Sequence, residues 1–191
     1  PAFTRALMER LEKNLPPESL RRALAGNNHG IPSSAFAAEK EAFEKAVSLD
    51  DYLAGKHARQ VAELQRCCTD GKVWFEQTIT QETVDFVAGN QEILSAVREG
   101  NVLYVTKIPY DPAKYLSETD PVMKRNYACH CPFAREAIKN GGPEISSNWC
   151  YCSAGFAKYP FEVLFERELR VELLSSVLRG DPVCRFAIYL D

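Results

Sequence analysis

The sequence predicts an α+β protein, in which N-terminal helices are followed by a small antiparallel sheet that packs on helices. Apolar residues repeat at helical spacing through the first 68 residues, and alternation typical of strands begins after Asp70-Gly71. The chain ends in two alternating segments joined by a turn. At 191 residues, of which 46% are hydrophobic, it is long enough for one ordinary core. We therefore expect a helical region over residues 1–68 and an α+β region with a cysteine cluster over 69–191, together forming one compact unit.

Four helices are predicted before the first strand. Phe3 and Leu7 begin a helical repeat in the first helix, which the prolines at 16 and 17 end. Gly26 stops the second helix. The expected elements are helices over residues 2–15, 18–25 and 34–49, a polar loop over 27–34, and a fourth helix capped by Asp50-Asp51.

Strands and short connecting elements are predicted in the middle of the chain. Val73 and Phe75 alternate in the manner of a strand, and Glu99-Gly100-Asn101 has the composition of a turn. The expected elements are a β-rich run over residues 72–80, a short helix near 91–98, a strand over 102–108 and a long surface loop over 109–123.

The C-terminus is predicted to form a β-hairpin. Its two strands cover residues 168–178 and 183–190, with a turn at 179–182 that contains Gly180 and Pro182. Cys184 alternates with apolar residues of the second strand. We expect it to be either a packed core thiol or a fifth residue of a metal site or pocket.

Four of the seven cysteines fall in two Cys-x-Cys pairs, Cys129-His130-Cys131 and Cys150-Tyr151-Cys152, with 18 residues between them. In an extended segment, residues i and i+2 face the same side, so each pair can offer both sulfur atoms to one partner. Residues 148–152 are expected to form a short strand that presents the second pair in this way.

Each pair also comes directly before a predicted helix. Pro132 favours the first position of a helix over residues 132–139, which residues 140–142 stop. Ser153 is expected to cap the helix after the second pair, and Pro160 to interrupt that helix. Backbone N–H groups at helix starts favour the thiolate, which is the form of cysteine that binds metals and attacks electrophiles.

A tetrahedral zinc-thiolate site is the leading interpretation of the two pairs, because Zn²⁺ accepts four thiolate ligands. The Cys-x-Cys spacing is less common in zinc sites than Cys-x₂₋₄-Cys, and it matches neither common ferredoxin pattern, so an iron–sulfur cluster ranks below zinc. Packing of the cysteines as small buried hydrophobes is the alternative without a function. The predicted metal ligands are Cys129, Cys131, Cys150 and Cys152, with Cys184 as a candidate fifth residue.

A reactive thiol is the second interpretation. Cys131 with the adjacent His130 is a candidate catalytic pair, in which the thiol is the nucleophile and the imidazole is a general acid or base. If the segment is extended, the His130 ring points away from a metal held by its neighbours. His29 lies in no motif and is assigned to the surface.

Candidate ligand-binding residues lie on both sides of the second pair. Trp149, Phe156 and Phe161 are expected to line an apolar pocket. Lys107, at the end of a predicted strand, is a candidate to bind an anionic ligand. The partner we expect is a small apolar or heterocyclic molecule.

Composition argues against several other classes of protein. A net charge of -3, from 23 Lys+Arg and 26 Asp+Glu, disfavours nucleic-acid binding. The sequence has no run of eighteen apolar residues, so we expect no membrane partner and a cytoplasmic location. Seven cysteines is an odd number, which favours a metal or a reactive thiol over a disulfide scaffold. The sequence leaves open whether the helical half forms a homodimer.

The C-terminal third also carries a resemblance to known families. Residues 150–156 and 178–188, with Gly180-Asp181 and Cys184-Arg185-Phe186, resemble the C-terminal part of the 4-vinyl reductase-type domain and of thiazoline-carboxylate hydrolase-like families. The resemblance implies the α+β ligand-binding fold of Golgi transport (TRAPP-type) subunits and nitric-oxide-sensing domains, with an apolar pocket between sheet and helices. Residues 129–133 also resemble the signature of an uncharacterised bacterial family.

The same resemblance implies a structural zinc. In sensors with this domain the zinc is held by cysteines, and the one in the final hairpin corresponds to Cys184. A second hairpin cysteine, eight positions earlier, is replaced here by Ser176. The zinc site is therefore not carried over whole, and Cys129 and Cys131 are candidates to complete it.

Two functions follow as expectations. The first is a sensor-like, small-molecule-binding domain whose zinc-thiolate site pins the sheet to the helices. The alternative is an enzyme, either a hydrolase of a small heterocyclic substrate, as the thiazoline-hydrolase resemblance implies, or a cysteine-dependent thiol enzyme. A hydrolytic metal would need three protein ligands and an open position for water.

Overall fold

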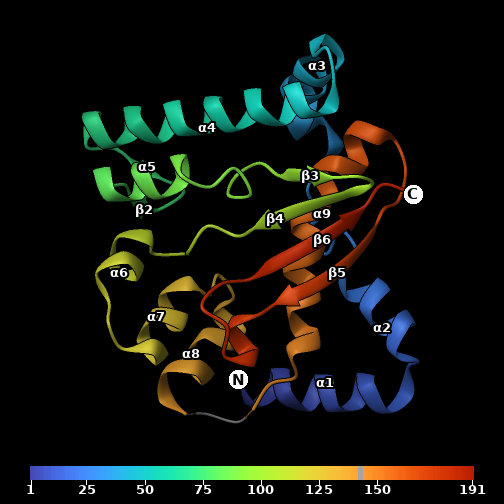
Figure 1. Ribbon diagram of the computed structural model, residues 1–191. Coiled ribbons are helices and arrows are strands. Elements are labelled where there is room, and N and C mark those ends of the chain that lie inside the picture. The colour runs from blue at the N-terminus through green and yellow to red at the C-terminus, as the bar shows by residue number, and fades with distance from the viewer. Residues whose placement is uncertain (142–143) are drawn as a thin grey trace.

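The computed structural model describes residues 1–141 and 144–191, and it confirms the α+β class (Figure 1). Helices surround a small antiparallel sheet of four strands. Part of the predicted helix stop over 140–142 lies outside the described residues, whereas Gly141 ends its helix with a φ of 56°. In the described part of the chain, no helix is both long and apolar enough to cross a membrane.

The N-terminal helices form as predicted, with two changes at their ends. The third helix begins as a 3₁₀ turn and stops early, and the fourth is capped by Ser48, whose Oγ accepts a hydrogen bond from Asp51 N at 3.1 Å. The Asp50-Asp51 cap was therefore wrong by two residues. The elements are α1 (Ala2–Asn14), α2 (Pro17–Leu24), η1 (Ser33–Phe36), α3 (Ala37–Lys45) and α4 (Leu49–Asp70).

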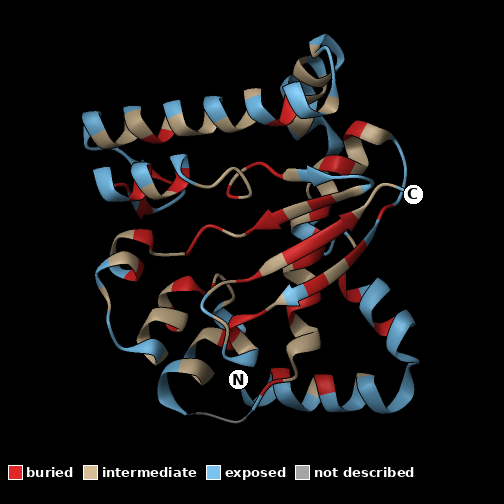
Figure 2. Cartoon of the chain, in the orientation of Figure 1, coloured by how far each residue is buried: buried red, intermediate tan, exposed pale blue. Residues whose placement is uncertain are grey.

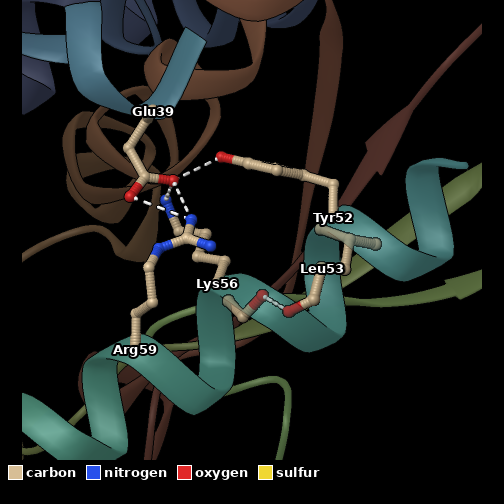
Figure 3. A network of polar contacts seen from close by, with 6 residues as sticks. Glu39, Tyr52, Leu53, Lys56 and Arg59 are labelled. Carbon is tan, nitrogen blue, oxygen red and sulfur yellow. Dashed lines mark hydrogen bonds and ion pairs between the residues drawn. The ribbon is translucent and has the colours of Figure 1, made fainter. Parts of the chain in front are cut away.

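A partly buried carboxylate joins α3 to α4 (Figure 3). Glu39 of α3 accepts hydrogen bonds from the Tyr52 hydroxyl at 2.7 Å and from Arg59, and it pairs with the Lys56 ammonium at 3.4 Å. Burial opposes ionisation of Glu39, but these three partners outweigh it and hold the pKa of the carboxyl below its usual value.

The middle of the chain differs from the prediction at the helix expected near residues 91–98. The helix lies earlier, because Thr80 caps α5 (Gln81–Ala88) and its Oγ1 accepts from Thr83 N at 3.3 Å. Asn90 Oδ1 then accepts from Glu92 N, which holds the next residues in a turn. The strands of this region are β1 (Val73–Trp74), β2 (Gln77–Thr78), β3 (Val97–Glu99) and β4 (Val102–Thr106).

The loop expected over residues 109–123 is two helices, α6 (Pro112–Ser117) and α7 (Pro121–Ala128). Each helix has a proline at its first position and an aspartate before it as the N-cap. Asp120 Oδ1 accepts from the backbone N–H groups of residues 122 and 123. The prolines that suggested a loop therefore begin helices.

The second cysteine pair lies on a helix and not on the predicted strand. Residues 148–152 fall in a 3₁₀ turn, η2 (Ser147–Cys150), which continues directly into α9 (Tyr151–Phe165). Ser146 caps this turn, so Ser153 lies inside the helix instead of capping it. The expected interruption at Pro160 is also wrong, since α9 continues through it. By contrast, α8 (Pro132–Asn140) forms where it was predicted.

The four-stranded sheet has the order β3-β4-β6-β5, and every neighbouring pair is antiparallel. The C-terminal hairpin, β5 (Arg170–Ser175) and β6 (Arg185–Tyr189), is present with shorter strands than expected. A 3₁₀ turn, η3 (Val177–Arg179), shortens the first strand because Ser176 caps it. Helix α9 packs against β5 and β6 and lies behind them in Figure 1.

Buried side chains form two apolar clusters (Figure 2). The larger cluster joins the sheet to α1, α2, α4 and α9. In the smaller one, Leu64 of α4 packs with Trp74 and Ile79 of the β1–β2 hairpin and with Val84 of α5. The expected boundary after residue 68 falls inside α4, and residues from both sides of it share this second cluster.

Candidate thiol site

Three segments bring five cysteines together, four of them near Lys107 and the fifth, Cys131, near Cys129 and Cys152. One pair lies between α7 and α8, the other at the start of α9, and Cys184 immediately precedes β6. Burial lowers the pKa of Lys107, and nearby thiols oppose this shift because a thiolate would stabilise the ammonium. The thiols within electrostatic range of Lys107 belong to Cys184, Cys129, Cys152 and Cys150.

Lys107 is held by its own backbone and by α9. Its N–H donates to the carbonyl of Cys184 at 2.9 Å, which continues the pairing of β4 with β6. Its Nζ donates to Ser153 Oγ at 2.6 Å and lies 5.1 Å from the centre of the Phe156 ring. Part of the Lys107 side chain remains exposed. The cation therefore sits at the edge of the cluster, beside the first turn of α9.

Cys152 lies in this first turn and faces a histidine that the sequence analysis assigned to the surface. Its Sγ is 3.4 Å from Nε2 of His29, and the His29 ring packs edge-on against Phe156 at 5.4 Å. Burial, and next the neighbouring Cys131, raise the pKa of Cys152, whereas Lys107 lowers it. The thiol therefore carries its proton at rest, next to a base that can accept it.

The loop that carries His29 is fixed against the end of α2. The Asn27 side chain donates to the Ile31 carbonyl at 2.8 Å, and the Asn28 side chain donates to the Leu24 carbonyl at 2.8 Å. Gly155 lies one turn after Cys152, where a Cβ would come within 2.6 Å of the Ala25 carbonyl oxygen. The missing side chain lets α9 approach the end of α2 and the His29 loop.

Cys150 and Cys184 form a buried pair with Ser176. The Ser176 hydroxyl donates to Cys150 Sγ at 3.1 Å. Interaction with the Cys150 thiol is the main cause that lowers the pKa of Cys184, and the same interaction raises the pKa of Cys150. Because its hydroxyl contacts Cys150, Ser176 also belongs to the cluster. It occupies the position where the resemblance implies a cysteine.

The two cysteines of the first pair differ in their exposure to solvent. Cys129 is buried, and burial raises the pKa of its thiol to about 12. Cys131 is partly exposed and accepts a hydrogen bond from Trp149 Nε1 at 3.1 Å, and Trp149 packs against Phe133. Trp149 therefore contacts a thiol of the site directly.

His130 points away from the thiols, as expected for an extended segment. Its Nε2 donates to the carbonyl of Ile108 at 2.6 Å, and its ring packs against Tyr110. Burial lowers the pKa of His130 to about 4. The hydrogen bond of His130 Nε2 therefore goes to the segment that follows β4, and no hydrogen bond to Cys131 is found among the described residues.

The five thiols do not form a ready zinc site. Among residues 1–141 and 144–191, no three Cys, His, Asp or Glu side chains are arranged as ligands of one metal ion. A tetrahedral site would require several of these side chains to turn toward one point. Zinc binding stays a prediction of the sequence.

The three aromatic residues predicted to line one pocket have different neighbours. Phe161 is buried in the larger cluster, Trp149 contacts Phe133, and Phe156 is 47% exposed beside His29. A cavity of about 650 Å³ lies elsewhere, between α2, the middle of α9 and the start of β5. Of the three, Phe156 is the one beside both Lys107 and Cys152.

His29 is the main site residue that the sequence analysis missed. It lies 123 residues before Cys152, and no spacing rule connects them. The available clues were local, namely two consecutive asparagines that fix a loop and a glycine in the first half of α9.

Residues 110–191 match the model of a family described as a family of unknown function (DUF6144). The match includes all five clustered cysteines and Ser176, but it excludes Lys107 and His29 and covers less than half of the chain. Neither the curated proteins nor the solved structures gave a match. The resemblance to 4-vinyl reductase-type domains therefore stays a prediction.

Proposed function

We infer that the chain is a cysteine-dependent enzyme in which Cys152 is the nucleophile and His29 the general base. The observation that carries this proposal is the 3.4 Å contact between Cys152 Sγ and His29 Nε2. Nucleophile and base in hydrogen-bond reach are the essential part of covalent thiol catalysis. Cys152 is partly exposed and His29 is exposed, so a small substrate reaches both.

The chemistry is hydrolysis through a covalent intermediate. His29 Nε2 takes the Cys152 proton while the sulfur bonds to the carbon of a C=O or C=N group. The bond to the leaving group then breaks, and the leaving group takes the proton from His29. Water next attacks the thioester or thioimidate carbon, His29 accepts a proton from that water, and the proton returns to the sulfur as the C–S bond breaks. The net reaction consumes one water and needs no oxidant or reductant.

The neighbours of Cys152 favour a small heterocyclic substrate with a negative charge. Lys107 and Ser153 lie together on the adjoining surface and supply a cation and a hydroxyl. Phe156 supplies an apolar face against which a flat ring can pack.

Acetyl transfer from p-nitrophenyl acetate tests this proposal without knowledge of the natural substrate. We expect p-nitrophenol release and an acetyl group on Cys152 in the mass spectrum of the digested protein. Cys152→Ala should abolish both, and His29→Gln should slow release on the order of 100-fold. Cys67→Ser is the matched control, because Cys67 lies on α4 outside the site, and it should leave the rate unchanged. Release at the wild-type rate by Cys152→Ala would contradict the proposal.

Zinc binding by a sensor-like domain is the second candidate function. It is supported by four thiols from three separate segments, those of Cys129, Cys150, Cys152 and Cys184, which lie within electrostatic range of Lys107. Metal analysis of protein purified without added metal tests it. Near-stoichiometric zinc that is lost in the Cys129→Ser, Cys150→Ser double variant would support this candidate, and folded protein without metal would exclude it.

A further inference from the structure

The four-stranded sheet ends at β5, which pairs with β6 on one side and with no strand of the described residues on the other. Backbone N–H and C=O groups along such an edge can pair with another extended chain. The cavity of about 650 Å³ meets β5 at this edge, because it is lined by the successive residues 170–172, whose side chains alternate between the two faces. Helix α2 forms the opposite wall of the cavity (Figure 1).

The alternation of backbone bonds determines which residues of β6 bond to β5. The N–H of Leu190, directly after β6, donates at 2.8 Å to the carbonyl of Asn101, directly before β4. Successive residues of a strand direct their N–H and C=O groups to opposite edges. Leu190 therefore bonds toward β4, and Tyr189 and Ala187 bond toward β5.

The register of the sheet then identifies the free backbone groups of β5. Tyr189 and Ala187 are aligned with Arg170 and Glu172, so these two residues of β5 bond to β6. Val171 lies between them, and its N–H and C=O groups point to the opposite edge, where the cavity lies. Among the described residues, no group is found that bonds to them at this edge.

The open part of the edge is short. On one side of Val171 the N–H of Leu169 donates to the Glu162 carboxylate at 2.9 Å, and on the other side the Leu173 carbonyl accepts from Arg179 Nη1 at 3.3 Å. A long strand added to β5 would have to displace both bonds. The edge is therefore suited to the end of a chain, in which one residue exchanges both of its backbone bonds with Val171.

One cation at the cavity has no partner for its charge. The Arg21 guanidinium of α2 lies over the Tyr151 ring, 5.6 Å from its centre, and the part of the chain that the structure describes contains no hydrogen bond or ion pair of this guanidinium. Such a group binds a carboxylate through two parallel hydrogen bonds. By contrast, the next residue, Arg22, donates twice to Glu168, at 2.9 and 2.6 Å.

The carboxylates of the cavity wall restrict the charge of a ligand. Glu172 is bound by Arg170 at 2.7 Å, and Glu18 and Asp191 also line the cavity. These side chains repel a peptide with several acidic residues, whereas Arg21 attracts a single carboxylate. The other residues of the ligand would therefore carry apolar or basic side chains.

We propose that the cavity binds the C-terminal residues of a partner protein, as a short strand added to β5 whose terminal carboxylate binds Arg21. The free N–H and C=O groups of Val171 require the spacing of donor and acceptor found in a peptide main chain, and Arg21 requires an anion. The end of a chain supplies both within a few residues. Neither Cys152 nor His29 lines this cavity, so the inference is independent of the proposed hydrolysis.

Amide hydrogen exchange of the full chain labelled with ¹⁵N tests the free edge. We expect the Val171 N–H to exchange on the order of 100-fold faster than the N–H groups of Arg170 and Glu172, which their bonds to β6 protect. Equal protection at the three positions would overturn the proposal, because Val171 would then have a partner within the chain.

Binding is tested with a displayed library of peptides that have random C-terminal residues and a free carboxylate. The most enriched sequence is synthesised as the acid and as the C-terminal amide, and each is labelled with fluorescein at its N-terminus. We expect fluorescence polarisation to show that the acid binds at least about 10-fold more tightly than the amide. A library without any enriched sequence, or equal affinities of acid and amide, would contradict the proposal.

Arg21→Gln tests the residue that would bind the carboxylate. Arg21 is exposed, so we expect the variant to fold and to bind the acid no more tightly than the wild type binds the amide. Arg66→Gln is the matched control, because Arg66 is an exposed arginine of α4 that does not line the cavity, and its affinity should equal that of the wild type. An undiminished affinity of Arg21→Gln would overturn the proposal.

The Val171 amide also reports where the enriched peptide binds. Addition of the acid to the wild type should shift the Val171 N–H resonance and slow its exchange, because a backbone bond to the peptide then protects it. A peptide with N-methyl groups at alternate residues, on the edge that would face β5, should bind at least about 10-fold more weakly. Tight binding that leaves the Val171 N–H unprotected would place the peptide on another surface and contradict strand addition.

Discussion

The contact between Cys152 and His29 depends on a residue that has no side chain. Gly155 faces the backbone at the end of α2, where an added Cβ would lie 2.6 Å from the Ala25 oxygen and 2.7 Å from the Gly26 oxygen. Both neighbours are backbone atoms and cannot turn aside. The positions of α9 and of the His29 loop are therefore coupled through this glycine.

Gly155→Ala is expected to destabilise the protein by about 1–3 kcal/mol, because overpacking forces the backbone to shift. The shift should also separate Cys152 from His29 and slow p-nitrophenyl acetate cleavage by the folded variant. Urea denaturation and the acetylation rate measure the two effects. An unchanged acetylation rate in the folded variant would show that the glycine does not set the contact.

Gly55→Ala is the matched control for this prediction. Gly55 lies inside α4, and its added Cβ would be 3.4 Å from the flexible end of Arg59. Alanine is a better helix former than glycine, so we expect Gly55→Ala to stabilise the protein by about 0.5–1 kcal/mol. The change from glycine to alanine should thus destabilise the protein at position 155 and stabilise it at position 55.

Ser176 provides a second prediction for a single residue. Its hydroxyl already touches Cys150 Sγ, so Ser176→Cys places a third thiol against the Cys150–Cys184 pair. Soft thiolate ligands favour zinc, and we expect this variant to bind zinc more tightly than the wild type in competition with a chromogenic chelator. Ser175→Cys is the control, because Ser175 Oγ bonds to the Val183 carbonyl instead. Equal affinities of the two variants would contradict the prediction.

Among the elements, the pairing of α3 with α4 depends on one carboxylate. Glu39 is 23% exposed and accepts from Tyr52 and Arg59, with Lys56 beside it. Its partners come from three successive turns of α4, so the carboxylate fixes both the position and the rotation of α3 (Figure 3). This arrangement predicts a measurable dependence of stability on pH.

Glu39→Gln is expected to destabilise the protein by about 1–2 kcal/mol near neutral pH, because the amide keeps the shape but loses the charge. The folded-state pKa of Glu39 lies below the ordinary value of 4.5. Ionisation therefore stabilises the folded chain above pH 4.5, and this contribution is lost as the pH falls through the folded-state pKa. Urea denaturation at about pH 7 and about pH 3.5 should show the difference between wild type and variant shrinking in acid.

Glu41→Gln is the control for this experiment. Glu41 pairs with Lys45 on the exposed side of α3, where both side chains are more than half exposed. Exposed pairs of this kind contribute little, so we expect less than about 0.5 kcal/mol at either pH. If the loss of stability in Glu39→Gln is the same at both pH values, the charge of Glu39 does not stabilise the folded protein as proposed.

The sequence predicted elements well where one local rule decided the structure. Pro132 began α8 and the alternation around Cys184 identified β6. It failed where two rules competed. Pro112 and Pro121 were taken as loop residues, yet each follows an aspartate cap and begins a helix. Residues 148–152 alternate like a strand, but the Ser146 cap and the packing of α9 on the sheet favour helical turns.

The site shows the same limit over longer distances. Clustering of the cysteines followed from their spacing, and the direction of the His130 ring followed from an extended segment. The pairing of Cys152 with His29, and of Cys150 with Cys184, depends on how α2, α9 and the hairpin pack together. No local pattern encodes these contacts.

For the whole molecule, the two apolar clusters determine whether the helical region and the α+β region unfold together. Leu64 of α4 is fully buried against Trp74, Ile79 and Val84, all of which follow the expected boundary at residue 68. The other end of α4 contributes Tyr52 and Leu53 to the larger cluster. One helix thus belongs to both clusters, and we expect a single unfolding transition.

Leu64→Ala tests this expectation with the two tryptophans as separate reporters. Trp74 lies in the smaller cluster and Trp149 beside Cys131, so Trp149→Phe and Trp74→Phe variants each leave one local fluorescence signal. Both signals should give the same urea midpoint, and Leu64→Ala should lower both equally, with a loss of about 2–5 kcal/mol from the cavity it creates. If Leu64→Ala lowers only the urea midpoint reported by Trp74, the two clusters unfold independently. In that case α4 does not couple the stability of the cluster at Leu64 to that of the cluster around Trp149.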